Sequence, residues 1–546
     1  MSSHFQWYPS DASVVVPWNA RYAYPNQSNK AVKTTPRIPP QSGGVFVPGN
    51  TIRLNFPAQG YLNCSNTTLT FDATMYGYGA HETSLVRFQN NIQSLFTRVR
   101  ILYGSTTLED VVDYAGIMRC LTEWTCTNQS TSMDGQSISD GIGGVVPACG
   151  PGGTAAGPVT SGLINTRSAI IQGLDGTVAT TGSATAQSGM GNVPNTSFGS
   201  GPTSSVTRYS TRRYQVNLGL GLLTQDKLIP LKYMASQLSI EITLAQPSGC
   251  MFAYPTTAAN SSTQPTYAIT NVNLIPELVE FDSSYDTEFV QGLEARGVPI
   301  KFSSWHTYSF ATGGSSTVNC QIQERSRSVK AIFAVLKRNP ENILTDSGAT
   351  FFDTAAANST GSTMQSYQFR IGGRYFPAQP VQLNLPGLSI SNGGAEAFVE
   401  LQKSLNILGD YRLSSSVNAL RWANQPATSA VATVGISSQL NEFDYLNDIV
   451  SYSAGGNPTY RARRINNATT GMSLEGSLAS ACFCSSIDLE TSNGIEISGL
   501  NAEEQSDISF NAAWSHPQDV TFGINVYTYY DAMIILKLNN VIDLVQ

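Results

Sequence analysis

The side chains that most often carry out chemistry are few in this chain and stand far apart. There are four histidines: His4, His81, His306 and His516. None of them has metal-ligand spacing to another histidine or to a pair of cysteines. The eight cysteines include no C-x-x-C pair, and Cys482 and Cys484 share one face of an expected strand. We therefore predict no metal site, no cofactor and reduced, mostly buried thiols.

Sequence motifs for catalysis are missing as well. No Gly-Lys dipeptide occurs, which excludes the phosphate-binding G-x-x-x-x-G-K-[ST] loop, and there is no G-x-S-x-G nucleophile elbow. Adjacent carboxylates at Glu109-Asp110 and Glu503-Glu504 could serve acid–base chemistry of the glycosidase type. A helix N-terminus and a solvated turn explain these two pairs more simply. We expect no catalytic residues and no enzymatic activity.

Aromatic and cationic residues gather instead near the N-terminus. Six of them are candidates for contacts with other subunits or with the inner surface of an assembly: Trp7, Tyr8, Trp18, Lys30, Lys33 and Arg37. Because six prolines interrupt this region, residues 1–45 are predicted to form an extended arm. The rings would pack on a neighbouring subunit, and the cations would face it or an enclosed nucleic acid. A frayed terminus is the alternative.

The composition favours a protein whose surface is covered by other protein. Charged residues make up 13% of the chain, whereas ordinary soluble domains have roughly 25%. The net charge of −7 argues against a protein that wraps nucleic acid along its whole length. No window of about 18 apolar residues occurs, and the N-terminus has no signal-peptide pattern. The sequence thus predicts a protein that neither spans a membrane nor is exported.

The hydrophobic pattern predicts an all-β protein with a few short helices. Apolar residues alternate with polar ones at Ile52–Phe56 and, most clearly, at Leu238–Leu244. Such strands are short and are separated by Gly and Pro, which is typical of β-sandwiches that bury the facing sides of two sheets. A short helix is expected around Glu288 to Leu293.

The clearest predicted helix runs from Thr106 to Trp124. Thr106 and Glu109 have the spacing of a capping box. An apolar stripe recurs at steps of three and four residues: Leu108, Val111, Val112, Ala115, Met118 and Leu121. This stripe, Val112 included, is expected to be buried against the first domain.

The chain is expected to contain an arm and two domains. Residues 1–45 form the arm, residues 46–290 the first β-sandwich, and residues 291–546 the second. Residues 127–206 are rich in Gly, Ser and Thr and lack periodicity, so they are predicted to be a long surface loop inserted in the first domain.

The second half of the chain is predicted to repeat the first. Residues 237–244 correspond to 505–514, and residues 271–281 correspond to 524–536. Residues 328–336 are expected to take the part that residues 97–102 take earlier. These matches predict two similar β domains.

Several short stretches resemble one known family. They are Asn55–Leu62, Ile92–Ser105 with Leu108-Glu109-Asp110, Leu121–Trp124, the junction 281–300, which begins Phe281-Asp282-Ser283-Ser284-Tyr285, and the ending Tyr527–Ala532. In these stretches the chain resembles the major capsid proteins of polinton-like viruses and virophages. The resemblance touches both halves and leaves residues 127–206 and 339–361 without a counterpart.

The resemblance implies a double jelly-roll fold and a structural role in a virion. Three copies would form a pseudo-hexagonal capsomer, and capsomers would tile an icosahedral shell around a double-stranded DNA genome. The partners would be further copies of this chain, a penton protein and minor or cement proteins, with weak, non-specific contact to packaged DNA. The loops would face outward and the termini inward.

A different class of function fits the strand pattern as well. A carbohydrate-binding or carbohydrate-active surface protein can also be built from β-sandwich domains. Such proteins usually need export, for which the sequence shows no signal.

Overall fold

The structure is a computed structural model. The described residues are 31–76, 85–88, 92–125, 209–254, 266–338, 364–383, 394–408, 434–435, 449–452, 458–460, 483–490, 497–504, 507–517, 522–537 and 542–545. Trp7, Tyr8, Trp18, Lys30 and the predicted surface loop 127–206 lie outside them.

The first half of the chain forms a sandwich of two antiparallel sheets. One sheet has the order β1 (Ala31–Thr34), β11 (Thr266–Phe281), β4 (Tyr61–Tyr76) and β8 (Tyr209–Val216), with β2 (Val45–Phe46) also paired to β11. The other has the order β3 (Thr51–Asn55), β9 (Leu238–Leu244), β6 (Phe96–Tyr103) and β7 (Thr106–Val112). A separate pair joins β5 (Leu85–Phe88) to β10 (Met251–Tyr254). We call this half the first sandwich.

The second half forms a second sandwich with its own two sheets. One has the order β12 (Val298–Ala311), β22 (Phe522–Leu536), β14 (Val329–Arg338) and β20 (Ser485–Asp488), with β23 (Ile542–Val545) on β22. The other has the order β13 (Thr317–Gln321), β21 (Ile508–Trp514), β15 (Met364–Ile371) and β16 (Arg374–Gln382). A small sheet joins β17 (Val434–Gly435), β19 (Pro458–Tyr460) and β18 (Ile449–Tyr452).

The two sandwiches repeat one strand order. The sheets β3-β9-β6-β7 and β13-β21-β15-β16 have the same spatial order. In each, the neighbouring strands are the first, fourth, second and third of that sheet along the chain. The predicted matches of residues 237–244 and 271–281 with the second half are confirmed, since β9 has the place of β21 and β11 that of β22. The third match, of residues 328–336 with residues 97–102, is wrong: β14 corresponds to β4, and β15 takes the place of β6. The continuous apolar run of β14 misled the assignment, whereas β15 shares the alternating burial of β6.

Alternating side chains fill each sandwich as the sequence predicts. In β9, Leu238, Ile240, Ile242 and Leu244 are fully buried. Phe71 of β4 meets Phe96 of β6 edge to face across the first sandwich, with ring centroids 5.7 Å apart. The described cysteines Cys64, Cys120, Cys250, Cys320 and Cys484 are buried thiols.

The helix predicted from Thr106 to Trp124 is wrong in its first half. Residues 106–112 form β7, which pairs with β6 through a two-residue turn at Gly104-Ser105, and helix α1 begins only at Tyr114 and ends at Thr125. Asp113 separates them with a positive φ of 53°. The capping-box spacing was misleading because the same residues alternate equally well as a strand, and Val112 is 45% exposed rather than buried.

Helix α7 (Ser283–Arg296) links the two sandwiches and is longer than the predicted 288–293 segment, so the predicted domain boundary near residue 290 falls within it. Asp282 caps its first turn by accepting a hydrogen bond from the Ser283 N–H. Phe289 packs on Tyr61 and Tyr233 of the first sandwich, with ring centroids 5.4 and 5.6 Å apart. The helix is therefore fixed to the first sandwich.

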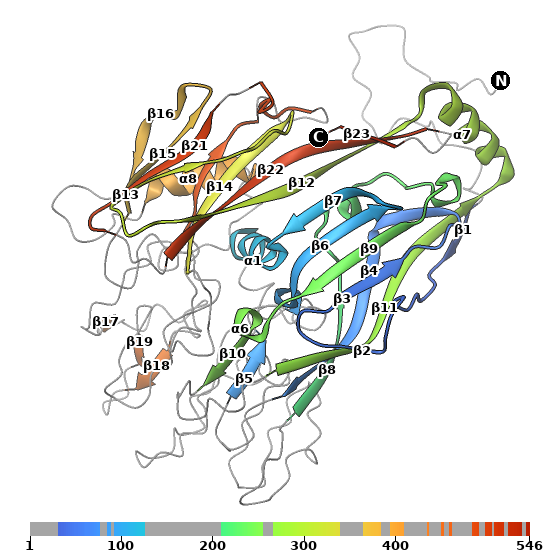
Figure 1. Cartoon of the computed structure of the whole chain (residues 1–546), viewed down its shortest axis with the longest axis horizontal. Helices are drawn as coiled ribbons and strands as arrows, with labels where there is room; N and C mark the ends of the chain where they lie inside the picture. Colours follow the sequence, from blue (N-terminus) through green and yellow to red (C-terminus); the bar gives the residue numbers. More distant parts are fainter. Residues whose placement is uncertain are drawn as a thin grey trace, which may run out of the picture.

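The linking helix α7 and the small strand pairs lie at opposite ends of the molecule. Figure 1 shows α7, β1 and β23 at one end, and the β5–β10 pair and the small sheet at the other. The second sandwich lies beside the first, with β12 passing along β7. Among the described helices, none is long and apolar enough to cross a membrane.

A buried carboxylate organises the loop between β13 and β14. Glu324 is 4% exposed and accepts hydrogen bonds from the Ser326 N–H and hydroxyl at 3.0 and 2.6 Å and from the Thr528 hydroxyl. His306 Nδ1 lies 3.1 Å from its Oε2. Burial alone would raise the pKa of Glu324, but the hydrogen bond and charge of His306, with the two hydroxyls, lower it to about 2.

This cluster predicts a loss of stability in acid. Because the pKa of Glu324 is lower in the folded protein than its usual 4.5, its contribution is complete above pH 4.5 and is lost as the pH falls towards 2. The contribution amounts to about 3 kcal/mol. We expect Glu324→Gln to lower the melting temperature at pH 7 and to flatten its dependence on pH between 7 and 3. Glu503→Gln, at an exposed ion pair with Arg327, is the matched control and should behave as wild type. Equal pH profiles for wild type and Glu324→Gln would contradict the prediction.

Candidate functional site at the seam between the two sandwiches

Two of the six predicted contact residues lie within the described structure. Lys33 is in β1, and its Nζ lies 2.5 Å from Oε2 of Glu277, a carboxylate that also accepts hydrogen bonds from Asn63 and Asn66. Arg37 is exposed, next to the pairing of Ile38 with β11. Lys33 is thus engaged by its own sheet, and residues 31–46 line that sheet rather than extending away from it.

The described residues with the most unusual environments lie elsewhere, along the contact between the two sandwiches, which we call the seam. The first sandwich contributes β7, α1 and the short helix α5 (Gly221–Thr224). The second contributes β12, β14 and β22. The sequence alone does not reveal this site, because its residues are spread over more than 400 positions of the chain.

Glu109 forms the polar centre of the seam. It is 1% exposed, and its carboxylate accepts hydrogen bonds from the N–H groups of Gly221 and Leu222 at 2.8 and 3.0 Å and from the Ser304 hydroxyl at 2.6 Å. Burial raises the pKa of Glu109 although these three bonds oppose the shift. The sequence suggested a helix N-terminus for Glu109, but the residue lies in β7 and ties that strand to α5 and to β12 of the other sandwich.

A second polar link lies at Asp113, directly after the end of β7. Asp113 Oδ2 accepts hydrogen bonds from the Asn525 amide at 2.9 Å and from the Tyr527 hydroxyl at 2.8 Å, both on β22. The Thr307 hydroxyl of β12 donates to the Val112 carbonyl at 2.7 Å. Side chains of the second sandwich thus donate hydrogen bonds to the Val112 carbonyl and the Asp113 carboxylate, where β7 ends and α1 begins.

Aromatic rings complete the seam beside these polar links. Trp124 at the end of α1 stacks on Phe333 of β14, with ring centroids 5.3 Å apart. Trp305 of β12 lies 4.5 Å from Tyr529 and 5.6 Å from Phe333 by the same measure. The Trp124–Phe333 stack buries apolar surface from both sandwiches, and Trp305 and Tyr529 extend this aromatic cluster within the second sandwich, so the seam has the character of a protein core.

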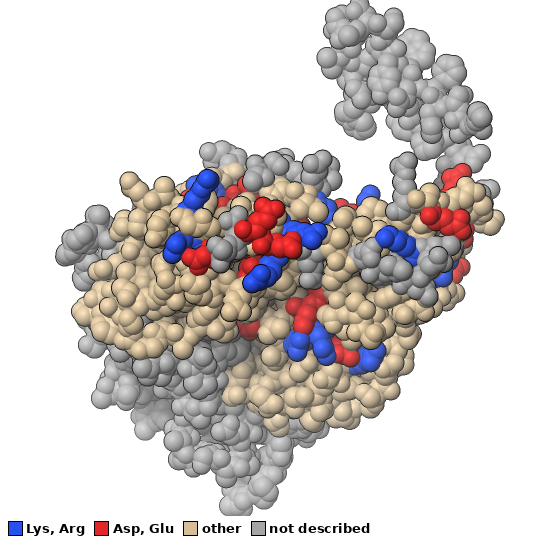
Figure 2. All heavy atoms as spheres, turned by 45° about the horizontal axis from the view of Figure 1, so that its top comes forward, with Lys and Arg blue, Asp and Glu red and all other residues tan. Residues whose placement is uncertain are grey.

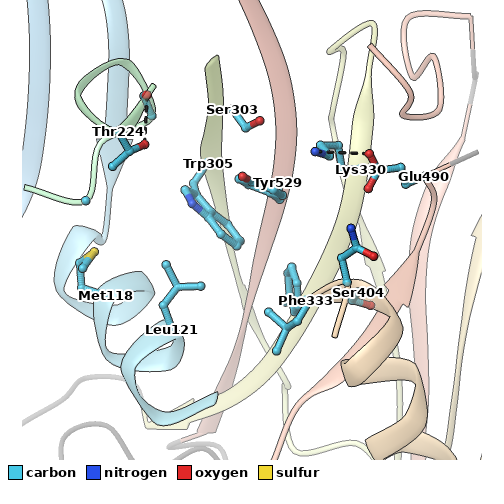
Figure 3. A pocket seen from close by; sticks show the side chains of 14 residues that line it. Met118, Leu121, Thr224, Ser303, Trp305, Lys330, Phe333, Ser404, Glu490 and Tyr529 are labelled. Atoms are coloured by element: carbon cyan, nitrogen blue, oxygen red, sulfur yellow. Dashed lines mark hydrogen bonds and ion pairs between the residues drawn. The ribbon is translucent and has the colours of Figure 1, made fainter. Parts of the chain in front are cut away.

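A cavity of about 400 Å³ opens at the seam. Figure 3 shows Met118 and Leu121 of α1 on one side and Lys330 with Glu490 on the other. The Lys330 Nζ lies 3.4 Å from Glu490 and 5.5 Å from the centroid of the Tyr529 ring. The cation is thus already paired, and among the described residues no group of three or more His, Cys, Asp or Glu side chains could hold a metal ion.

One glycine lets the two backbones meet. A Cβ atom on Gly221 would lie 1.8 Å from the Ser303 carbonyl oxygen, well inside contact distance. Only glycine therefore allows α5 to approach β12 closely enough for the N–H groups of Gly221 and Leu222 to reach Glu109.

Comparison with known proteins identifies the architecture. No protein-family model and no curated protein matches the sequence. Solved structures do match: PBCV-1 VP54, fitted into a cryo-EM reconstruction of the virophage Sputnik, has a TM-score of 0.50 and 11% identity over 96% of this chain and 98% of that one. The 3.5 Å cryo-EM structure of the Sputnik virophage gives 0.50 and 11%, covering 99% and 94%. The chain has the double jelly-roll fold. The two sandwiches are its two jelly rolls.

The seam between the jelly rolls predicts a sharp difference between two glycine substitutions. Gly221→Ala would force α5 away from β12 and should cost about 3 kcal/mol or more, lowering the melting temperature. Gly292→Ala in α7 is the control, because no atom lies within 4 Å of the added methyl group. Alanine favours a helix over glycine by about 1 kcal/mol, so this variant should melt at or above the wild-type temperature. Thermal unfolding followed by tryptophan fluorescence measures both, and a wild-type melt for Gly221→Ala would show that the backbones are not in contact.

Proposed function

We propose that this protein is a major capsid protein whose trimer tiles an icosahedral shell around double-stranded DNA. The observation that carries the proposal is the seam. It joins two jelly rolls of the same topology through a buried carboxylate, backbone contact and stacked rings, so that each chain is one rigid block with two similar halves. The solved structures that share this fold are viral, as their titles state.

A rigid block of two similar halves suits ring closure. Three chains supply six jelly rolls, and a head-to-tail contact that closes after three steps gives a pseudo-hexagonal tile. Such tiles can surround each other in a shell. The particle would also contain a penton protein and minor or cement proteins.

The surface supports contact with other protein. Figure 2 shows Lys, Arg, Asp and Glu in small groups with wide areas of other residues between them. Several charges of the described residues are paired within the chain, such as Arg98 with Asp110 and Arg100 with Glu241. Paired charges attract DNA weakly, so packaged DNA would be contacted non-specifically and mainly by the N-terminal arm.

The trimer is tested by mass and shape. Light scattering of the purified protein should give three times 58.6 kDa, and negative-stain images should show pseudo-hexagonal particles. A monodisperse monomer at micromolar concentration would refute the trimer. Glycan-array binding or glycosidase activity by that monomer would instead support the carbohydrate-binding alternative.

The arm, with Trp7, Tyr8, Trp18 and Lys30, is proposed to serve assembly rather than folding. The test is deletion of residues 2–30, which ends before β1 and therefore keeps the pairing of Lys33 with Glu277. We expect the melting temperature of the capsomer to stay within a few degrees of wild type while the yield of closed particles on expression falls severalfold. Normal yields of equally salt-resistant particles would show that the arm is dispensable.

A further inference from the structure

The cavity at the seam has no role in the proposed shell, yet it has the size of a ligand pocket. Its volume of about 400 Å³ lies within the range of roughly 300–1,000 Å³ that is usual for small-molecule sites. The first jelly roll lines it with α1 and α5, and the second with β12, β14 and β22. A molecule bound there would touch both jelly rolls of one chain.

One end of the cavity is apolar and largely aromatic. Figure 3 shows Met118 and Leu121 of α1 next to Trp305, with Tyr529 and Phe333 beyond it. Trp305 and Phe333 are buried, whereas Met118 and Leu121 are half-buried and leave this end open on the side of α1. A flexible methionine adapts well to a flat ring, and rings stack favourably on one another. This end is therefore suited to an aromatic group.

The polar part of the lining consists mainly of hydrogen-bond acceptors. Three hydroxyl groups there each donate their proton to the protein itself: Ser303 to Asp531 at 2.7 Å, Thr224 to the Gly221 carbonyl at 3.2 Å and Ser404 to the Glu400 carbonyl at 2.8 Å. A hydroxyl that has used its proton can still accept through its oxygen. The hydroxyls in the lining thus favour a ligand that donates hydrogen bonds.

The charges at the polar end also favour a donor that is positively charged. Lys330 Nζ lies 3.4 Å from the Glu490 carboxylate and 3.8 Å from that of Asp531. The side chains of Glu490 and Asp531 are only 9% and 4% exposed, so solvent screens them weakly. Two carboxylates against one ammonium group leave a net negative charge beside the cavity, which attracts a cation and repels an anion.

We propose that the cavity binds a small aromatic amine. Its ring would lie between Met118, Leu121 and Trp305, and its protonated amino group would donate to Glu490 and to the Ser303 oxygen. The aromatic walls add a cation–π attraction for the same group. This inference goes beyond the proposed capsid function and does not depend on the trimer.

The test uses three probes that share one ring system and differ in charge. Tryptamine carries an amine that is protonated at pH 7, indole has no charged group, and indole-3-acetate carries a carboxylate. Each is titrated against the full-length protein and followed by saturation-transfer NMR of the ligand. Tryptamine should bind with a Kd of about 1 mM, which is usual for a ligand of this size. Indole should bind more weakly, and indole-3-acetate at least about tenfold more weakly.

A conservative variant tests the role of charge. Glu490→Gln keeps the shape of the side chain and removes its charge, so it should weaken tryptamine binding about tenfold and leave indole binding unchanged. Glu503→Gln is the matched control, because Glu503 is an exposed carboxylate of the same jelly roll that pairs with Arg327 and does not line the cavity. This control should bind all three probes as wild type does.

The position of the bound ring is measured without altering the cavity. The chain has ten methionines, and ¹³C labelling of their methyl groups gives each an NMR signal. The signal of Met118 is assigned by its loss in Met118→Leu. Tryptamine should shift the Met118 signal of the wild-type protein more than any other methionine signal, because the aromatic ring would lie against that methyl group.

Three results would overturn the proposal. If indole-3-acetate binds as tightly as tryptamine, Lys330 rather than the carboxylates selects the ligand, and the site does not prefer amines. If tryptamine binds but leaves the Met118 signal in place, it occupies another part of the protein. If none of the three probes binds saturably, the cavity is not a site for aromatic ligands.

Discussion

The carboxylate of Glu109 lies where water cannot reach it, and the position of both jelly rolls follows from how it is satisfied. Burying a charged group is costly unless several donors surround it, and here two come from the backbone of α5 and one from β12 of the other jelly roll. Those donors reach it only if β7, α5 and β12 hold one relative orientation. A purely apolar seam would tolerate sliding, whereas this one fixes direction as well as distance.

The aromatic contacts supply the apolar burial that the polar centre at Glu109 does not. Stacking of Trp124 on Phe333 removes large apolar surfaces from water, which is the main favourable contribution to such contacts. The polar links and the close approach at Gly221 then select one arrangement among the many that apolar burial would permit. Orientation and affinity at the seam thus come from different residues, and a substitution can weaken one without removing the other.

The sequence predicted much of the fold but little of the seam. Alternation at Leu238–Leu244 was enough to place a buried strand, and many short strands indicated sandwiches. The same alternation misled at residues 106–112, where an apolar stripe at helical spacing and a strand pattern coincide and the tertiary pairing with β6 decides. Glu109 could not be assigned from sequence, because its partners Gly221 and Ser304 become neighbours only when both jelly rolls are folded. A close backbone approach such as that at Gly221 leaves no periodic signal in the sequence either.

Helix α7 makes the contact between the two jelly rolls of one chain form before any contact between chains. A helix of this length spans roughly 21 Å and holds the second jelly roll close to the first from the moment both exist. The first contact between jelly rolls is therefore intramolecular, with a high effective concentration that dilution does not change. Contacts between chains have no such tether and depend on how many copies the cell has made. A chain of this design completes its internal contact at any expression level, and in the proposed shell the growth of the assembly would wait until enough protein has accumulated.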